Sequence, residues 1–205
     1  MRNIRLKLSA KFQSSVTLSC GEGRGEVLVA SSFVEGRVRS KAVIFFVLAL
    51  FIFSGSKAQV QSSAFNLTLK SLLSHSVPEV TVPQLKAMSD VLLLDAREKS
   101  EYEVSHLGNA KFVGYKKFEI ETLKAINKKQ KIVVYCSVGY RSEKVSEKLK
   151  QAGFTDVSNL YGGIFEWVNQ GNSVVDNKEN ATEKIHAYNK TWGVWLSKGV
   201  KVYPK

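Results

Sequence analysis

The sequence predicts an α/β fold with a central parallel sheet of five strands flanked by helices, and two observations support this prediction. Short apolar runs typical of strands alternate with helical patterns from Val80 onward. Two of these runs, Val91–Asp95 and Lys131–Tyr135, are almost continuously apolar, as in strands that are buried on both faces. Strands that alternate with helices imply parallel neighbours and a sheet covered on both sides.

The strands are expected where β-branched and large apolar residues cluster between turn-forming residues. The five expected strands are Val80–Val82, Val91–Asp95, Lys111–Val113, Lys131–Tyr135 and Val157–Leu160.

The helices are expected between these strands, where apolar residues recur three or four positions apart. In the clearest case Val145 and Leu149 are four apart, and Gly153 follows as a stop signal. The expected helices are Gln84–Met88, Glu98–Val104, the amphipathic Lys117–Ile126, and Arg141–Ala152.

The chain divides into a main domain and flanking segments. We expect a leader at 1–58, a linker with a short helix at 59–77, the α/β domain at 78–173 and a tail at 174–205. In the tail, aromatic residues recur at helical spacing across Lys184–Leu196, which predicts an amphipathic helix docked on the domain. Val200–Tyr203 is expected to add a last extended piece.

The leader contains the pattern of a signal peptide. Its apolar run, Ala42–Phe53, has 12 residues, whereas a membrane-spanning helix needs about 20. Basic residues precede the run, and small residues at Ser56 and Ala58 follow it. We therefore expect export, most plausibly to a bacterial periplasm, with cleavage after Ala58 and no stable membrane span afterwards. Translation starting at Val38 would give a signal peptide of ordinary length.

Composition and charge narrow the classes of function. With 44% hydrophobic and 23% charged residues, the chain has enough apolar surface to fold. The leader carries nine basic and three acidic residues. Its surplus of six positive charges is half of the formal charge of +12. The tightest basic run elsewhere, Lys128, Lys129 and Lys131, has no interleaved aromatic residues. No nucleic-acid partner is expected.

Cys136 is the residue on which a reactive site would depend. The sequence holds two cysteines, and the other, Cys20, belongs to the leader. A lone thiol in an exported protein forms no internal disulfide, so it is either buried and inert or exposed and used. Cys136 falls where a buried strand is expected to end, and ligands of parallel sheets bind at such carboxyl ends.

The residues after Cys136 favour a reactive thiolate. Gly139 allows a tight curl in which successive backbone N–H groups point inward, and the helix that follows adds its positive end. Such a cradle stabilises an anion, including the thiolate of Cys136, and Arg141 offers a planar fork to an oxyanion. Each residue alone would be ordinary: a buried cysteine, a turn glycine and a solvated arginine. Their combination at strand end, loop and helix start favours the functional interpretation.

Three ordered motifs extend over nearly ninety residues of the chain. The first is Asp95-Ala-Arg97-Glu with Glu101-Tyr and His106-Leu-Gly-Asn-Ala, the second is Cys136-Ser137-Val138-Gly139-Tyr140-Arg141 followed by Ser142, and the third is Leu160 to Trp167. Together they closely resemble the first signature, the active-site loop and the closing signature of the rhodanese family of sulfurtransferases. The resemblance does not reach residues 1–75 or the tail beyond about Ser173.

The resemblance implies a compact domain and a double-displacement reaction without a cofactor. The Cys136 thiolate would take sulfur from a small sulfur-containing donor and pass it from a persulfide to a thiol or to cyanide. Asp95 and Arg97 would support the loop from beneath. The donor would be thiosulfate or a persulfide or polysulfide. Relatives that use thiosulfate often carry basic residues at the positions of Ser137 and Tyr140, whereas here only Arg141 is charged, which makes a persulfide or polysulfide an alternative to thiosulfate.

Two other functions fit parts of the pattern. Related folds use a cysteine loop ending in arginine as a phosphatase, with five residues between the two. Here Ser137–Tyr140 make four, so the ring is tighter than a phosphate needs. A rhodanese fold can also serve as a non-catalytic binding module, although inactive relatives generally lack the cysteine. Scattered histidines, His75, His106 and His186, give no metal-binding spacing.

Overall fold

The computed structural model describes residues 60–204, which include all of the expected α/β domain. The expected leader with its cleavage point after Ala58, and Cys20 within it, lie outside the described residues. Among residues 60–204, no helix is both long enough and apolar enough to cross a membrane.

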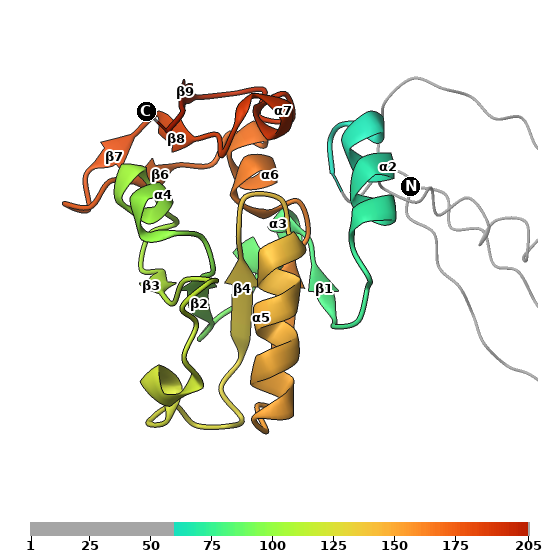
Figure 1. The fold of residues 1–205 in the computed structure, drawn as a ribbon, viewed down its shortest axis with the longest axis vertical. Helices are drawn as coiled ribbons and strands as arrows, with labels where there is room; N and C mark the ends of the chain where they lie inside the picture. Colours follow the sequence, from blue (N-terminus) through green and yellow to red (C-terminus); the bar gives the residue numbers. More distant parts are fainter. Residues whose placement is uncertain (1–59, 205) are drawn as a thin grey trace, which may run out of the picture. The chain divides into compact units, whose positions relative to one another are not determined.

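A five-stranded parallel sheet in the order β1-β5-β4-β2-β3 forms the centre of the domain (Figure 1). This confirms the predicted α/β class. The strands of this sheet are β1 (Glu79–Val80), β2 (Leu92–Asp95), β3 (Lys111–Phe112), β4 (Ile132–Tyr135) and β5 (Val157–Leu160). The helices of the domain are α3 (Val82–Lys86), α4 (Lys99–Val104), the 3-10 turn Ile120–Leu123, α5 (Tyr140–Gln151) and α6 (Gly163–Asn169).

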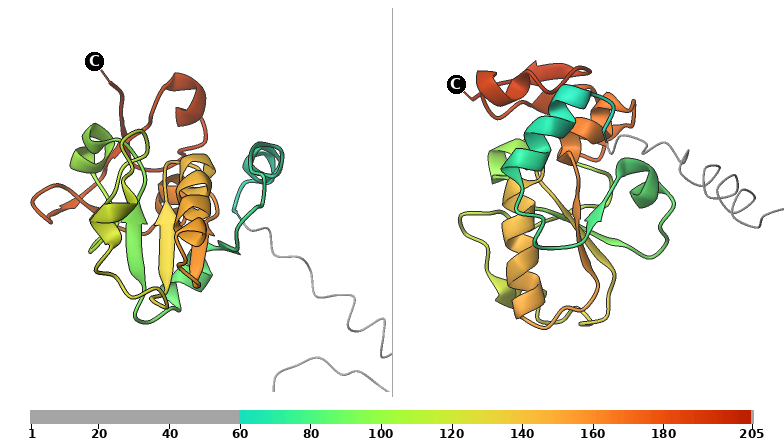
Figure 2. Two further views of the ribbon diagram at one scale, coloured as in Figure 1. Left: turned by 60° about the horizontal axis from the view of Figure 1, so that its bottom comes forward. Right: turned by 90° about the vertical axis from the view of Figure 1, so that its right-hand side faces the viewer.

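Strand β4 shows why its apolar run is continuous. Val133 and Tyr135 belong to the larger apolar cluster, whereas Ile132 and Val134 belong to the smaller one that also contains Val145 of α5. Since successive side chains of a strand point to opposite faces, both faces of β4 are buried, and all four residues are fully enclosed. Two views of the ribbon show the helices around the sheet (Figure 2).

Several sequence-based boundaries in the domain are wrong, and the helix expected at Gln84–Met88 is α3 at Val82–Lys86. The first strand ends at Val80 because Thr81 begins α3 with a capping box to Gln84. The expected amphipathic helix Lys117–Ile126 is only a 3-10 turn over Ile120–Leu123. There the Thr122 hydroxyl donates to the backbone oxygen of Glu119, which offers the backbone an alternative to continued helix.

The segments on either side of the domain form small elements of their own. Helix α2 (Ser63–Leu72) precedes the sheet. After α6 come the antiparallel pair β6 (Val174–Val175) and β7 (Ala181–Thr182), the parallel pair β8 (Lys184–His186) and β9 (Val200–Val202), and the four-residue helix α7 (Lys190–Gly193).

The prediction of one amphipathic helix over Lys184–Leu196 is wrong. Its first part is strand β8, because Ile185 and His186 are buried and pair with β9. Tyr188 then has a φ of 62°, and Asn189 caps the short helix α7, so the chain turns where the helix should continue. The predicted extended piece after Val200 is confirmed as β9.

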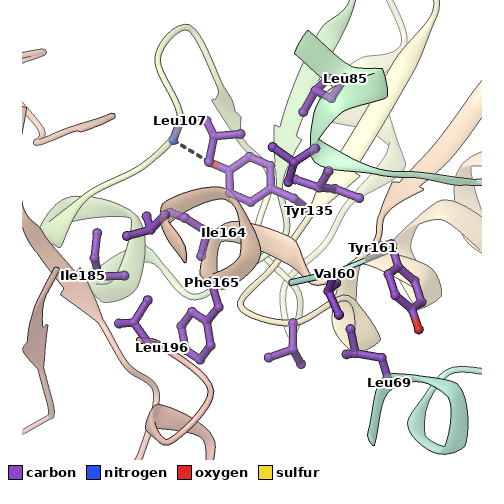
Figure 3. Packing of buried hydrophobic residues seen from close by; sticks show 14 of the residues in the cluster. Val60, Leu69, Leu85, Leu107, Tyr135, Tyr161, Ile164, Phe165, Ile185 and Leu196 are labelled. Atoms are coloured by element: carbon purple, nitrogen blue, oxygen red, sulfur yellow. Dashed lines mark hydrogen bonds between the residues drawn. The ribbon is translucent and has the colours of Figure 1, made fainter. Parts of the chain in front are cut away.

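These flanking segments share one apolar cluster with the domain. Val60 and Leu69 from the N-terminal side, and Ile185 and Leu196 from the C-terminal side, pack with Phe165 of α6 (Figure 3). The Phe65 ring of α2 stacks on Trp195 with centroids 5.3 Å apart. The described chain therefore folds around a core larger than the predicted domain.

Candidate functional site

Cys136 lies at the carboxyl end of β4, directly before the loop that leads into α5. Its side chain is 1% exposed, and the backbone N–H of Gly139 donates to its Sγ at 3.1 Å. The structure thus places a potential nucleophile beside a donor in a sheltered position.

Gly139 makes the curl of the loop possible. Its φ of 124° is a conformation that side-chain-bearing residues rarely adopt, and it forms the N-cap of α5. The first N–H groups of a helix have no partner within the helix, so the start of α5 brings partial positive charge to the loop. Of the N–H groups in the predicted cradle, that of Gly139 is bonded to Cys136 Sγ.

Arg141 does not offer a free fork, which corrects the expectation from the sequence. Its Nη1 and Nη2 atoms donate to the two carboxylate oxygens of Glu101 at 2.6 and 2.8 Å. Nη2 also donates to the Ser137 hydroxyl at 3.0 Å, and that hydroxyl donates to Glu101 at 3.2 Å. The cation is neutralised by a nearly buried carboxylate, which the sequence motif contained but to which no role was assigned.

Glu101 and Arg141 each stabilise the charged form of the other. Burial pushes the pKa of Glu101 upward, but the hydrogen bonds and charge of Arg141 outweigh it and hold the pKa below its ordinary value. Burial likewise lowers the pKa of Arg141, and Glu101 together with the nearby Cys136 raises it above the ordinary value. Both groups are therefore ionised at neutral pH.

Ser142 and Asn159 hold the loop from the side of β5. The Ser142 hydroxyl donates to Asn159 Oδ1 at 2.7 Å, and Asn159 Nδ2 donates to the backbone oxygen of Gly139 at 3.0 Å. Asn159 is fully buried and was not singled out in the sequence. No local signal marks it, because the neighbouring Ser158 is polar as well, and only the register between β4 and β5 places Asn159 behind the loop.

The start of α6 contacts the loop closely at Gly163. The backbone N–H groups of Ile164 and Phe165 donate to the backbone oxygens of Cys136 and Ser137 at 2.9 and 3.1 Å. A Cβ at Gly163 would stand 2.3 Å from the Cys136 oxygen. The absence of a side chain at Gly163 therefore allows α6 to approach the loop.

Asp95 and Arg97 form a fully buried ion pair at the end of β2. Arg97 Nη2 donates to Asp95 Oδ2 at 2.6 Å and to the backbone oxygen of Ser105 at 2.6 Å. The guanidinium also lies 5.7 Å from the ring centre of Tyr135, the residue before Cys136. Tyr135 in turn accepts the N–H of Leu107 (Figure 3). This arrangement agrees with support from beneath the loop.

His186, in the C-terminal segment, lies beside the ion pair. Its Nδ1 is 3.9 Å from Glu101 Oε1, within ion-pair range, but the same atom accepts the N–H of Tyr188 at 3.2 Å. Burial lowers the pKa of His186 in spite of the Glu101 charge. The ring is therefore neutral at neutral pH. Within residues 60–204, no cluster of His, Cys, Asp or Glu side chains could hold a metal ion.

A cavity of about 230 Å³ opens over Cys136. Its inner wall comes from the loop, and its outer wall comes from segments outside the predicted domain. The lining residues are Leu72, Cys136, Ser137, Val138, Tyr140, Arg141, Tyr188 and Trp192. The loop residues were expected there, whereas Leu72, Tyr188 and Trp192 were not, because only the folded chain brings them to the loop.

Comparisons with known proteins agree with the fold. The tRNA uridine(34) hydroxylase of Aster yellows witches'-broom phytoplasma is 41% identical over 83 residues, which are 38% of this chain and 27% of that protein. The protein of that name from Escherichia coli (strain K12 / DH10B) is 40% identical over 83 residues, covering 38% of this chain and 24% of that protein. The chain thus spans about a quarter of the length of these relatives.

A solved rhodanese-like domain protein from Staphylococcus aureus is 29% identical and superposes with a TM-score of 0.40, covering 44% of this chain and 90% of that one. The family model of the rhodanese-like domain matches residues 81–170. These residues contain the sheet strands β2 to β5, the Cys136 loop and the glycines of α6. The chain therefore carries a rhodanese-like domain over residues 81–170.

Proposed function

We propose that this protein is a sulfurtransferase that carries sulfane sulfur as a persulfide on Cys136. The observation that supports this most directly is the Cys136 Sγ at the base of a cavity, with the N–H of Gly139 donating to it. A thiolate in such a position is a nucleophile for sulfur, and a persulfide formed there is an anion that the same donor stabilises.

The reaction balances without an external oxidant or reductant. In the first step the Cys136 thiolate attacks the outer sulfur of a donor R–S–SH, a new S–S bond forms, and the donor's S–S bond breaks. The thiolate RS⁻ leaves with the electron pair. In the second step an acceptor thiolate, or cyanide in an assay, attacks the outer sulfur of the Cys136 persulfide and regenerates the Cys136 thiolate.

The comparisons support the domain more than a whole activity. The relatives named tRNA uridine(34) hydroxylase share only the segment of 83 residues with this chain. Their hydroxylation is therefore not proposed for this chain. Because Glu101 neutralises Arg141, a doubly charged donor such as thiosulfate gains little from the loop, and a persulfide or polysulfide is the better donor.

We also propose that the protein is exported to the periplasm and cleaved after Ala58. The support comes from the sequence: a basic segment, the apolar run Ala42–Phe53 and small residues before the cut. N-terminal sequencing of the protein recovered from a periplasmic extract should begin at Gln59. A sequence that begins upstream of Ala42 would contradict the proposal.

The transfer reaction is tested on the thiol itself. After incubation with inorganic polysulfide, the intact mass of the purified protein should rise by one sulfur atom, and cyanide should remove that atom as thiocyanate. Cys136→Ser should abolish both changes and keep the fold, because a serine hydroxyl is not appreciably ionised at neutral pH. In the uncleaved chain, which still contains residues 1–58 and therefore both cysteines, Cys20→Ser is the matched control and should retain both changes.

Each other outcome has a distinct meaning. A folded protein that gains no sulfur from any donor would contradict transfer and favour a non-catalytic binding module. Hydrolysis of an aryl phosphate that disappears in Cys136→Ser would favour a phosphatase. Thiocyanate production retained by Cys136→Ser would place the reactive thiol elsewhere.

A further inference from the structure

The outer wall of the Cys136 cavity is apolar and comes from two segments outside the family match. Leu72 is the last residue of α2, Tyr188 follows β8, and Trp192 lies in α7. The family match covers residues 81–170 only. A property of this wall therefore belongs to this chain rather than to the domain it shares with its relatives.

The wall is held in place by specific contacts. Residues Ser74 and Ser76, just after α2, donate their backbone N–H groups to the buried carboxylate of Glu143 in the first turn of α5. Tyr188 donates its N–H to His186, and its ring lies 5.0 Å from the Arg141 guanidinium carbon. The Phe65–Trp195 stack joins the two flanking segments. The wall is thus a packed part of the fold.

The charge inside the cavity is balanced. Arg141 is the cationic residue among the lining side chains, and both its terminal nitrogens are bonded to Glu101. A dianion placed beside Cys136 would give up its hydration without a free cation in return. A persulfide donor R–S–SH, which carries no charge, gives up much less hydration on entry. The persulfide anion formed on Cys136 then lies near the positive start of α5.

The size of the cavity limits the donor. At about 30 Å³ for each water-sized group, a volume of 230 Å³ holds roughly seven or eight such groups. That is room for two sulfur atoms and a short hydrocarbon substituent. The apolar surface of Leu72, Tyr188 and Trp192 would cover such a substituent, whereas a peptide-sized or charged substituent would have to remain outside.

We propose that the donor is a small organic persulfide with a short apolar substituent, and that Leu72, Tyr188 and Trp192 are the residues that select it. The proposal rests on the transfer function proposed above, since it names the substrate class of the same site. The chemical step is the one already balanced: the Cys136 thiolate takes the outer sulfur, and RS⁻ leaves with its substituent against the apolar wall.

A series of straight-chain alkyl persulfides, generated in the assay, tests the proposal. In the unmodified protein kcat/KM for sulfur transfer to cyanide should rise about fourfold for each added methylene until the cavity is full, and then stop rising. In Trp192→Ala and in Leu72→Ala the rise per methylene should fall to about twofold or less. Val194→Ala and Leu67→Ala are matched controls on the same two segments, and they lie outside the cavity.

The outcomes separate this proposal from the one on which it rests. If the protein transfers sulfur from polysulfide but shows no dependence on alkyl length, the apolar selection is wrong and the transfer function stands. A rise that is equal in Trp192→Ala and Val194→Ala would also overturn the role of the wall. If no donor transfers sulfur at all, the proposed function itself fails.

Discussion

The two walls of the Cys136 cavity differ in origin, in chemistry and in how they are held. The inner wall is the loop Cys136–Ser142, a polar segment tied by hydrogen bonds to α4, β5 and α6. The outer wall consists of Leu72, Tyr188 and Trp192, which are apolar or aromatic and reach the site from the flanking segments. If the proposed function and the proposed donor are right, reactivity and selectivity reside in separate parts of this chain.

The two walls are stabilised by different kinds of contact. The inner wall uses buried hydrogen bonds and an ion pair, which are costly to break because unpaired buried groups lose their solvation. The outer wall uses packing of partly exposed side chains, and Tyr188 is 42% exposed. Substitutions in the inner wall should therefore damage the fold more than substitutions at the mouth of the cavity.

The largest effect is expected at Gly163, where α6 meets the loop. A Cβ there would stand 2.3 Å from the Cys136 oxygen, and the φ of 57° adds strain. Gly163→Ala should lower the free energy of unfolding by about 3 kcal/mol or more and slow alkylation of Cys136 relative to its native rate. Urea unfolding followed by circular dichroism measures the stability.

Gly153→Ala is the matched control for that substitution. Gly153 also has a positive φ, 89°, but nothing lies within 4 Å of its added Cβ. Gly153→Ala should lower the free energy of unfolding by only about 1 kcal/mol, because backbone strain is its one cost. Equal losses at the two positions would show that the approach of α6 to the loop is not what requires a glycine.

A smaller loss of stability is expected when Glu101 no longer neutralises Arg141. Glu101→Gln keeps the shape but removes the charge, so the free energy of unfolding should fall by about 2 kcal/mol, less than for a deeply buried pair since Arg141 reaches the cavity. The freed cation should raise kcat/KM for thiosulfate several-fold. An unchanged kcat/KM for thiosulfate would show that neutralisation of Arg141 is not what limits the use of this donor.

The matching control is Glu147→Gln. Glu147 pairs with Lys144 on α5 at a more exposed position, outside the cavity. Glu147→Gln should lower the free energy of unfolding by less than about 1 kcal/mol and leave the donor preference unaltered.

His186 lies beside Glu101, the partner of Arg141 in the inner wall, and accepts the N–H of Tyr188 in the outer wall. Protonation of His186 should therefore lower the free energy of unfolding. Burial lowers its pKa, so as the pH falls below about 6.5 the unfolded chain binds a proton that the folded chain does not. Stability contributed by this group is complete above the ordinary pKa and decreases as the pH falls toward the folded value. The slope is at most about 1.4 kcal/mol per pH unit.

Unfolding free energies measured between about pH 8 and pH 5 check this sign. The unmodified protein should lose more stability over this range than His186→Gln, which has no ring to protonate. Parallel curves for the two proteins would mean that His186 takes its proton equally well in the folded and unfolded states.

The smallest effect is expected at Tyr140, which is 41% exposed at the mouth of the cavity. Tyr140→Lys adds a cation whose attraction for thiosulfate, after screening at an exposed position, is worth about 1 kcal/mol. The value of kcat/KM for thiosulfate should rise about fivefold and decrease with added salt. A salt-independent change would point to altered packing instead of charge.

The inner wall was largely predictable from the sequence, because its residues are adjacent in the chain. A buried strand followed by Cys136, Gly139 and a helix is a local pattern, and the structure has that arrangement. The pairing of Arg141 with Glu101 was not predictable in this way. Glu101 is forty positions away in another helix, and the fold alone brings the two together.

The outer wall was not predictable because its local pattern was misleading. The aromatic spacing of Lys184–Leu196 suits a helix, but β8 gains hydrogen bonds from β9 and buries Ile185, which outweighs the local preference. Lys117–Ile126 failed for a related reason: one turn is enough to bury Leu123. Asn159, the polar residue behind the loop, required knowledge of the register between β4 and β5.

The order of residues along the chain has a consequence for biosynthesis, because Tyr188 and Trp192 come after Cys136. A ribosome makes Cys136 and its loop before it makes these two residues on the other side of the cavity. In that interval Cys136 and Arg141 are open on that side to small oxidants and thiols. The interval ends when Tyr188 and Trp192 have been made and have packed over the loop.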